Sequence, residues 1–147
     1  MAAFSRRRPI RGLSTIETAL ILPLCLLVLF GIIELSRLVA DRQLLDNAAF
    51  QAAHLAAVST TTLTTADLQT QVATCYTGHP TAPGLAVLVY QADPTSGQNV
   101  GVWTDAGRGD CIGVEATAVH SIILPMFGLL PNTVTLHAKS VVYSEGN

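Results

Sequence analysis

The distribution of apolar and polar residues divides the chain into two unlike parts. Residues 18–33 contain no charged side chain and read TALILPLCLLVLFGII, which as a helix spans about 24 Å. The hydrocarbon core of a bilayer is about 30 Å thick, so a span must extend past both ends of this run and take in Glu17 and Glu34. We therefore expect a transmembrane helix over residues 13–39 with a carboxylate near each end.

The helical pattern continues beyond this apolar run. Successive spacings of 7, 4, 3 and 4 put five apolar residues on one helical face, namely Leu38, Leu45, Ala49, Ala52 and Ala56. Because alanine is small, another backbone can approach this face closely, either the sheet of the same domain or a neighbouring helix. We favour the first interpretation, in which the face belongs to the domain's own core.

The remaining sequence predicts a short helix and several strands. Thr64 and Asp67 are placed to cap a helix over residues 66–75. Apolar runs and alternating patterns predict strands over 85–90, 100–103, 112–123 and 133–143. The expected fold class is α+β, with a long N-terminal helix, membrane-spanning in its first half, packed on a small antiparallel β-sheet.

Composition and charge narrow the class of protein. Half of the 147 residues are apolar and 12% are charged, against about 25% in ordinary soluble domains. This excludes a disordered chain, a coiled coil and a basic nucleic-acid-binding module.

Four of the eight basic residues lie in the first eleven positions, at Arg6, Arg7, Arg8 and Arg11. By the positive-inside bias this end stays in the cytoplasm, and the chain after Val39 lies outside.

Three interpretations of the N-terminus are open. It is a cleaved secretory signal, for which Leu38-Val39-Ala40 is a poor cleavage site, or a plain signal anchor in which Glu17 is an interfacial carboxylate. In the third interpretation Gly12 and Glu17 act as a unit. Pro23 cannot donate to the Ala19 carbonyl, so a helix kink is expected there in each case.

The third interpretation is carried by particular residues. Gly12-Leu13-Ser14-Thr15-Ile16-Glu17, preceded by arginines, is similar to the class III signal that prepilin peptidases cut on the cytoplasmic side. The segment Ile16-Glu17-Thr18-Ala19-Leu20-Ile21-Leu22-Pro23, followed by Phe30-Gly31-Ile32-Ile33-Glu34, resembles the TadE-like family of Tad (tight adherence) pilus pseudopilins. The resemblance is densest over residues 11–57, and it departs from the family at Thr18, where an aromatic residue is usual.

The resemblance implies a function and a set of partners. Cleavage after Gly12 would free an amine on Leu13, and the Glu17 carboxylate would pair with the Leu13 amine of a neighbouring subunit. The chain would be a minor pseudopilin of a Tad pilus that contributes to pilus assembly and surface adhesion, because a major pilin is little more than the apolar helix. Its partners would be the prepilin peptidase, the other Tad pilins and pseudopilins, the inner-membrane secretion platform and membrane lipid.

The same resemblance sets the expected organisation and location. Residues 1–12 would form a basic cytoplasmic leader, 13–39 a transmembrane helix and 40–147 an extracytoplasmic TadE-like domain. The protein would cross the bacterial inner membrane once and could also reside in the pilus. Two other classes stay open: a signal-anchored extracytoplasmic binding or adhesion module outside any filament, and a secreted small hydrolase.

The cysteines and histidines were tested for chemistry. Cys75 and Cys111 would both face an oxidising compartment, which favours a disulfide over two free thiols or half of a metal site. The histidines His54, His79, His120 and His137 do not converge in sequence, and the strand patterns put the last two on opposite faces. We expect no metal site and no cofactor. The absence of a nucleophile elbow, a dinucleotide fingerprint and a P-loop in the sequence makes an enzyme the least favoured class.

Overall fold

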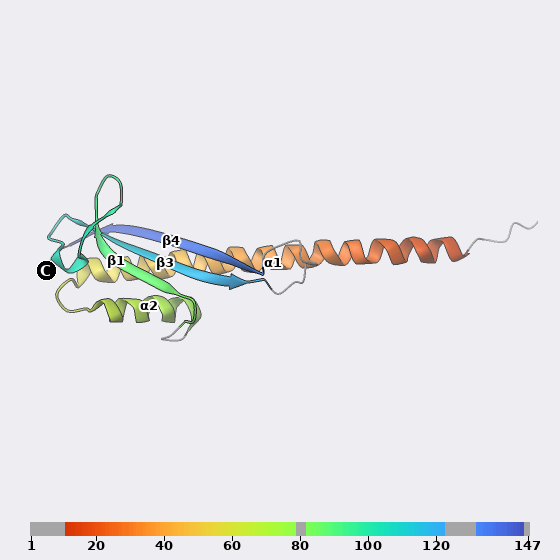
Figure 1. The fold of residues 1–147 in the computed structure, drawn as a ribbon, viewed down its shortest axis with the longest axis horizontal. Helices are drawn as coiled ribbons and strands as arrows, with labels where there is room; N and C mark the ends of the chain where they lie inside the picture. Colours follow the sequence, from red (N-terminus) through yellow and green to blue (C-terminus); the bar gives the residue numbers. More distant parts are fainter. Residues whose placement is uncertain (1–10, 79–81, 123–131, 146–147) are drawn as a thin grey trace, which may run out of the picture.

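One long helix carries a small α+β domain at its C-terminal half (Figure 1). The computed structural model describes residues 11–78, 82–122 and 132–145, with side chains from residue 15 onward. Helix α1 (Arg11–Val58) has 48 residues, so it is about 72 Å long, and the described part of the domain packs on its C-terminal portion, from Glu34 onward. This confirms the predicted long N-terminal helix.

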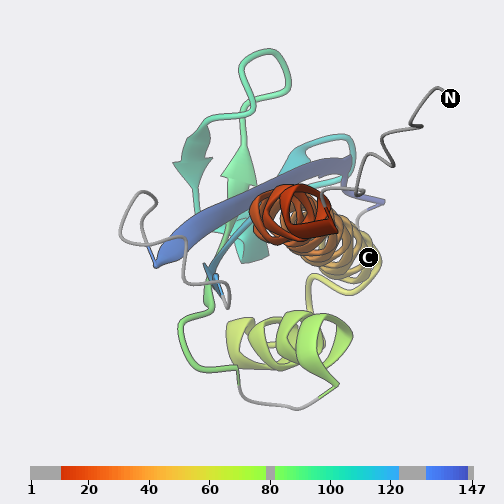
Figure 2. The same cartoon turned by 90° about the vertical axis from the view of Figure 1, so that its right-hand side faces the viewer.

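The domain has a helical layer on one face of an antiparallel sheet (Figure 2). The strands are β1 (Ala86–Ala92), β2 (Asn99–Gly101), β3 (Cys111–Ser121) and β4 (Thr133–Tyr143), in the order β2-β1-β3-β4. Helix α1 packs on β3 and β4, and α2 (Thr65–Thr77) packs beside α1 and on β1. The predicted α+β class is therefore confirmed.

The core joins an alanine-rich face of α1 to apolar side chains of the sheet. On α1 the buried side chains include Leu45, Ala48, Ala49, Ala52, Ala53, Ala56 and Ala57, all at most 1% exposed. Facing them are Ile112, Val114, Ala116 and Ala118 of β3 with Leu136 and Ala138 of β4. Alanine opposite alanine lets the helix axis lie close to the sheet. The alanine face of α1 thus belongs to the domain's own core, as we favoured.

Helix α2 begins with the capping box that the sequence predicts. The Thr64 backbone N–H donates to the Asp67 carboxylate (2.9 Å), and the Asp67 N–H donates to the Thr64 hydroxyl (3.3 Å). Hydrogen bonds from the Thr64 hydroxyl and then from its backbone lower the pKa of Asp67. The helix ends at Gly78, which adopts the left-handed conformation with φ 77°.

The 100–103 strand prediction is wrong at its end. Strand β2 stops at Gly101, and Trp103 instead opens a 3₁₀ turn, Trp103–Asp105. The turn places the indole in the core at 1% exposure, where its Nε1–H donates to the Thr65 hydroxyl (3.0 Å). Burial of a large aromatic side chain together with a satisfied N–H outweighs two further ladder positions on an edge strand. The remaining part of the predicted strand forms β2, which pairs antiparallel with β1.

The sheet face away from the helices is held by a tyrosine over a glycine. Tyr90 and Gly113 are direct partners across β1 and β3, and the ring is 2% exposed. The Tyr90 hydroxyl lies 2.9 Å from the Glu115 carboxylate and 3.2 Å from the Gly97 carbonyl oxygen. A Cβ at Gly113 would come within 2.7 Å of two ring carbons of Tyr90. The close stacking of ring on backbone therefore requires glycine at this position.

We predict that Gly113→Ala lowers the free energy of unfolding of the domain by about 1–3 kcal/mol, because the buried ring must shift. Gly107→Ala is the matched control, since a Cβ there meets only the Asp110 carboxylate at 3.6 Å. Urea unfolding of the full chain in detergent, followed by the fluorescence of the single, buried Trp103, measures both. Equal stability of the two variants would contradict this account of Tyr90.

Candidate functional site

The apolar segment of α1, residues 18–33, is uncovered. Its large side chains are between 41% and 73% exposed, with Leu26 at the low end and Leu20 at the high end. Helix α1 is the helix in the described part of the chain that is long and apolar enough to cross a membrane, and none of its most apolar window is buried. This segment is therefore a surface that needs lipid or other apolar helices around it.

The predicted processing residues lie at the start of this helix. The backbone is helical from Arg11, so Gly12, Leu13 and Glu17 belong to the first turns of α1. Leader residues 1–10 and the side chain of Leu13 lie outside the described part of the structure. The Glu17 side chain is exposed, one helical turn from Leu13 in sequence. Cleavage at Gly12 and pairing through Glu17 stay predictions.

Helix α1 is continuous through Pro23, whose ring removes one helical donor. The surrounding residues keep their helical assignment on both sides. The predicted kink stays a prediction. Further along, the Ser36 hydroxyl donates to the Ile32 carbonyl (2.8 Å), which satisfies a polar side chain at the end of the apolar segment.

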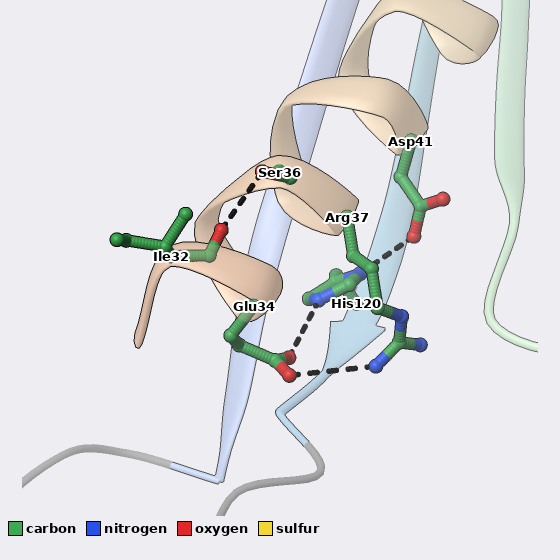
Figure 3. A network of polar contacts seen from close by, with 6 residues as sticks. All are labelled: Ile32, Glu34, Ser36, Arg37, Asp41 and His120. Carbon is green, nitrogen blue, oxygen red and sulfur yellow. Dashed lines mark hydrogen bonds and ion pairs between the residues drawn. The ribbon is translucent and has the colours of Figure 1, made fainter. Parts of the chain in front are cut away.

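A charged junction joins this end of the apolar segment to the sheet (Figure 3). His120, near the end of β3, points at α1 with its side chain 2% exposed. Its Nδ1 lies 2.6 Å from Asp41 Oδ2, and its Nε2 lies 3.3 Å from Glu34 Oε1. The other Glu34 oxygen accepts from Arg37 Nη1 at 3.4 Å. Two carboxylates of the helix therefore flank one buried imidazole of the sheet.

We did not predict this junction from the sequence, although two signals for it were present. Glu34 and Asp41 are separated by seven residues and share the helical face of Leu38 and Leu45, which the apolar spacing had identified as core. His120 has the same strand phase as Ala116 and Ala118, so the alternation places it in the core layer. The helical spacing of Leu38 and Leu45, continued to the polar positions, reaches Glu34 and Asp41, and the strand alternation of Ala116 and Ala118, continued by two residues, reaches His120.

The other described histidines stand apart. His54 is exposed on α1, and the His137 ring lies on the opposite sheet face from His120, with Nδ1 3.2 Å from the Thr117 hydroxyl. This confirms the predicted opposite faces of His120 and His137. His79 lies outside the described residues. Within residues 11–78, 82–122 and 132–145 no cluster of three or more His, Cys, Asp or Glu side chains is arranged to hold a metal ion.

The predicted disulfide between Cys75 and Cys111 is wrong, because both residues are free cysteines. Cys75 lies on α2, on the helical side of the sheet, and its thiol donates to the Gln51 side-chain oxygen (3.2 Å). Cys111 has the strand phase of Gly113 and packs with Tyr90 on the opposite face. The sheet therefore separates the two thiols. An oxidising compartment and an even number of cysteines outside the membrane favoured a disulfide. The alternation of side chains along β3 puts Cys111 on the sheet face opposite to Cys75, and this excludes the disulfide.

The opposite face of the sheet carries its own ion pair. The Lys139 ammonium lies 3.0 Å from the Glu115 carboxylate and 5.6 Å from the centre of the Tyr90 ring. The hydrogen bonds from Lys139 and then Tyr90 lower the pKa of Glu115, and burial raises the pKa of Tyr90. Both charged side chains are more than 40% exposed, so the pair contributes little to stability. Its geometry positions the tyrosine and offers no further chemistry.

The geometry defines a class of protein: a small α+β domain carried on the second half of a helix whose first half is apolar and uncovered. The family described as TadE-like protein matches residues 12–54 of this chain. This confirms the resemblance seen in the sequence, over the apolar segment and most of the alanine face of α1. The match ends before α2 and the sheet. No curated protein and no solved structure matches the chain.

We predict that both thiols outside the apolar segment are alkylated without prior reduction, at different rates. Burial, and then the carboxylates of Asp110 and Asp93, raise the pKa of Cys111, so its thiolate fraction near neutral pH is below that of an ordinary thiol. Cys111 should therefore react with iodoacetamide about tenfold or more slowly than the half-buried Cys75. Peptide mass spectrometry of the native chain measures both rates.

Unfolding the chain in urea before alkylation is the control, because it should bring the two rates together. A Cys75–Cys111 linked peptide in the unreduced native protein would contradict the structure.

Proposed function

We propose that the protein is a minor pseudopilin of a Tad pilus, which contributes to pilus assembly and surface adhesion. The observation that carries this proposal is the uncovered apolar segment of α1, which continues without interruption into the core of an α+β domain. The TadE-like match over residues 12–54 supports it. A helix of this kind can be moved as a unit from a lipid environment to a bundle of similar helices, with the domain attached.

The proposed orientation follows from charge. The leader arginines stay in the cytoplasm, residues 13–39 cross the inner membrane once, and residues 40–147 lie outside as the pilin domain. Arg37 and Arg42 follow the apolar segment and pair with Glu34 and Asp46 on the same helix (3.4 and 3.9 Å). These two arginines stand against four in the leader, so the excess of positive charge still favours a cytoplasmic leader.

The continuity of α1 argues against a cleaved secretory signal. Cleavage at the Leu38-Val39-Ala40 sequence would cut α1 directly before its alanine face. It would also remove Glu34 from the junction with His120 while leaving Asp41 at a new chain end. Processing after Gly12 removes none of the described contacts between α1 and the domain, because these contacts begin at Glu34 (Figure 1). We therefore propose that a prepilin peptidase cuts between Gly12 and Leu13.

Removal of the leader gives Glu17 a partner. The new Leu13 amine is cationic, and Glu17 is an exposed carboxylate at the edge of the apolar segment. An unpaired charge in a membrane costs a few kcal/mol, and a salt bridge to a neighbour's amine neutralises two charges together. Pairing at one position on each helix also fixes the axial register of adjacent subunits.

The proposed partners follow from these surfaces. The leader and first turn of α1 meet the prepilin peptidase, and the apolar segment meets membrane lipid and the helices of other Tad pilins and pseudopilins. The inner-membrane secretion platform would move the subunit out of the bilayer. The folded domain that follows α1 makes a structural and assembly role more suitable than that of the short major pilin.

We predict that Glu17→Gln leaves membrane insertion intact and blocks assembly. A neutral amide is cheaper in lipid than a carboxylate, whereas the Leu13 amine of the next subunit loses its counter-charge. Breaking one side of a buried ion pair costs about 3–5 kcal/mol, a loss of a hundredfold or more in association. The measurement is piliation, together with co-purification of the other pilins, at equal membrane levels of the two proteins.

Glu17→Asp is the matched control, because it retains the charge and should retain part of the assembly. Normal pili from Glu17→Gln would contradict the pairing. The protein would then be a signal-anchored binding or adhesion module that stays outside the filament.

A further inference from the structure

The contacts between His120 and α1 determine how many protons the imidazole ring of His120 must carry. A neutral imidazole has one N–H donor and one acceptor nitrogen, and an ionised carboxylate accepts only. In the structure both ring nitrogens face carboxylate oxygens, Nδ1 at 2.6 Å from Asp41 and Nε2 at 3.3 Å from Glu34. While both carboxylates are ionised, both contacts are hydrogen bonds only when the ring carries two protons and a positive charge.

The surroundings of the ring suit a cation. On α1 the charged groups near it are Glu34, Asp41 and Arg37, of which Arg37 turns toward the outer oxygen of Glu34 (Figure 3). On α2 the charge of Asp41 reaches Tyr76, whose pKa is raised by burial and then by this charge. On β4 the register partner of His120 is the uncharged Val134. The two carboxylates offset the cost of burying an imidazolium at 2% exposure.

His120 also lies at the end of the sheet where the sheet meets the apolar segment of α1. His120 and Val134 form the last pair but one of the β3–β4 ladder, which ends at Ser121 and Thr133. On α1 its two partners lie above and below Leu38, at the point where the apolar segment meets the alanine face. The sheet and the helix are thus joined here by hydrogen bonds to charged groups, whereas their shared buried core is made of apolar side chains.

We propose that the imidazolium form of His120 fixes the end of the β3–β4 ladder to α1 through its hydrogen bonds to Asp41 and Glu34. When the ring loses a proton, this end of the ladder separates from α1. After deprotonation one ring nitrogen presents a lone pair to a carboxylate oxygen, and a buried attraction becomes a repulsion. The open state would free the end of the β3–β4 hairpin from the helix while the alanine face stays packed. This device is independent of whether the chain enters a filament.

The direct test is the protonation of the ring in the intact protein. The full chain in detergent micelles, with ¹⁵N in its histidine rings, is examined by NMR at pH 7, and the signals are assigned with single His→Gln variants. We expect both nitrogens of His120 to be protonated, and we expect Glu34→Gln or Asp41→Asn to leave one of them unprotonated. One protonated and one bare nitrogen in the wild type would overturn the proposal, whatever the variants do.

Release is tested on the backbone amides. As pH is raised, the amides of residues 119–121 and 133–135 should change with the same midpoint as the His120 ring, while those of residues 112–114 stay unchanged. At constant pH, His120→Gln should speed hydrogen exchange of the amides of residues 119–121 and 133–135 about tenfold. The control His54→Gln, at an exposed position on α1, should leave these exchange rates unchanged. Ring deprotonation without any amide change would contradict the release.

Discussion

The structure depends on the close packing of the alanine face of α1 against apolar side chains of β3 and β4. A single helix has to serve two surroundings, and the size of its side chains changes where the surroundings change. In the apolar segment they are large and uncovered, which suits lipid or other helices. From Leu45 onward the buried face of the helix is made of alanine, apart from Leu45 itself, so the sheet can lie close to the helix axis. This contact transmits any force on the apolar segment to the folded domain, because the same rigid helix belongs to both.

The polar groups lie where this apolar packing stops. Toward the apolar segment, His120 is held between Asp41 and Glu34, where the alanine face gives way to longer side chains. On the opposite sheet face, Tyr90 covers Gly113 and is held by Glu115 and the turn at Gly97. Each group settles the orientation of an element that small side chains alone would leave free to slide. Buried polar contacts can supply such specificity where uniform apolar packing does not.

Much of this fold could be read from the sequence, and the failures have physical causes. The 3.6-residue period of α1, the capping box at Thr64 and the alternation in β3 and β4 are local signals, and each gave the correct element. The Cys75–Cys111 bridge failed because compartment and cysteine count carry no information on which sheet face a residue occupies. Trp103 left the predicted strand because tertiary burial outweighed local pattern. The junction joins His120 to Asp41 and Glu34, which lie 79 and 86 positions earlier in the sequence, and only the fold brings these residues together.

Helix α1 is one unbroken helix, and we propose that its leader is removed at its first turn. The mature N-terminus, determined by sequencing the protein purified from cells that contain the prepilin peptidase, tests this most directly. We predict Leu13 as the first residue of the mature chain, with the whole apolar segment retained. A chain that begins at Met1 or Ala2, or one that begins after the apolar segment, would contradict the claim.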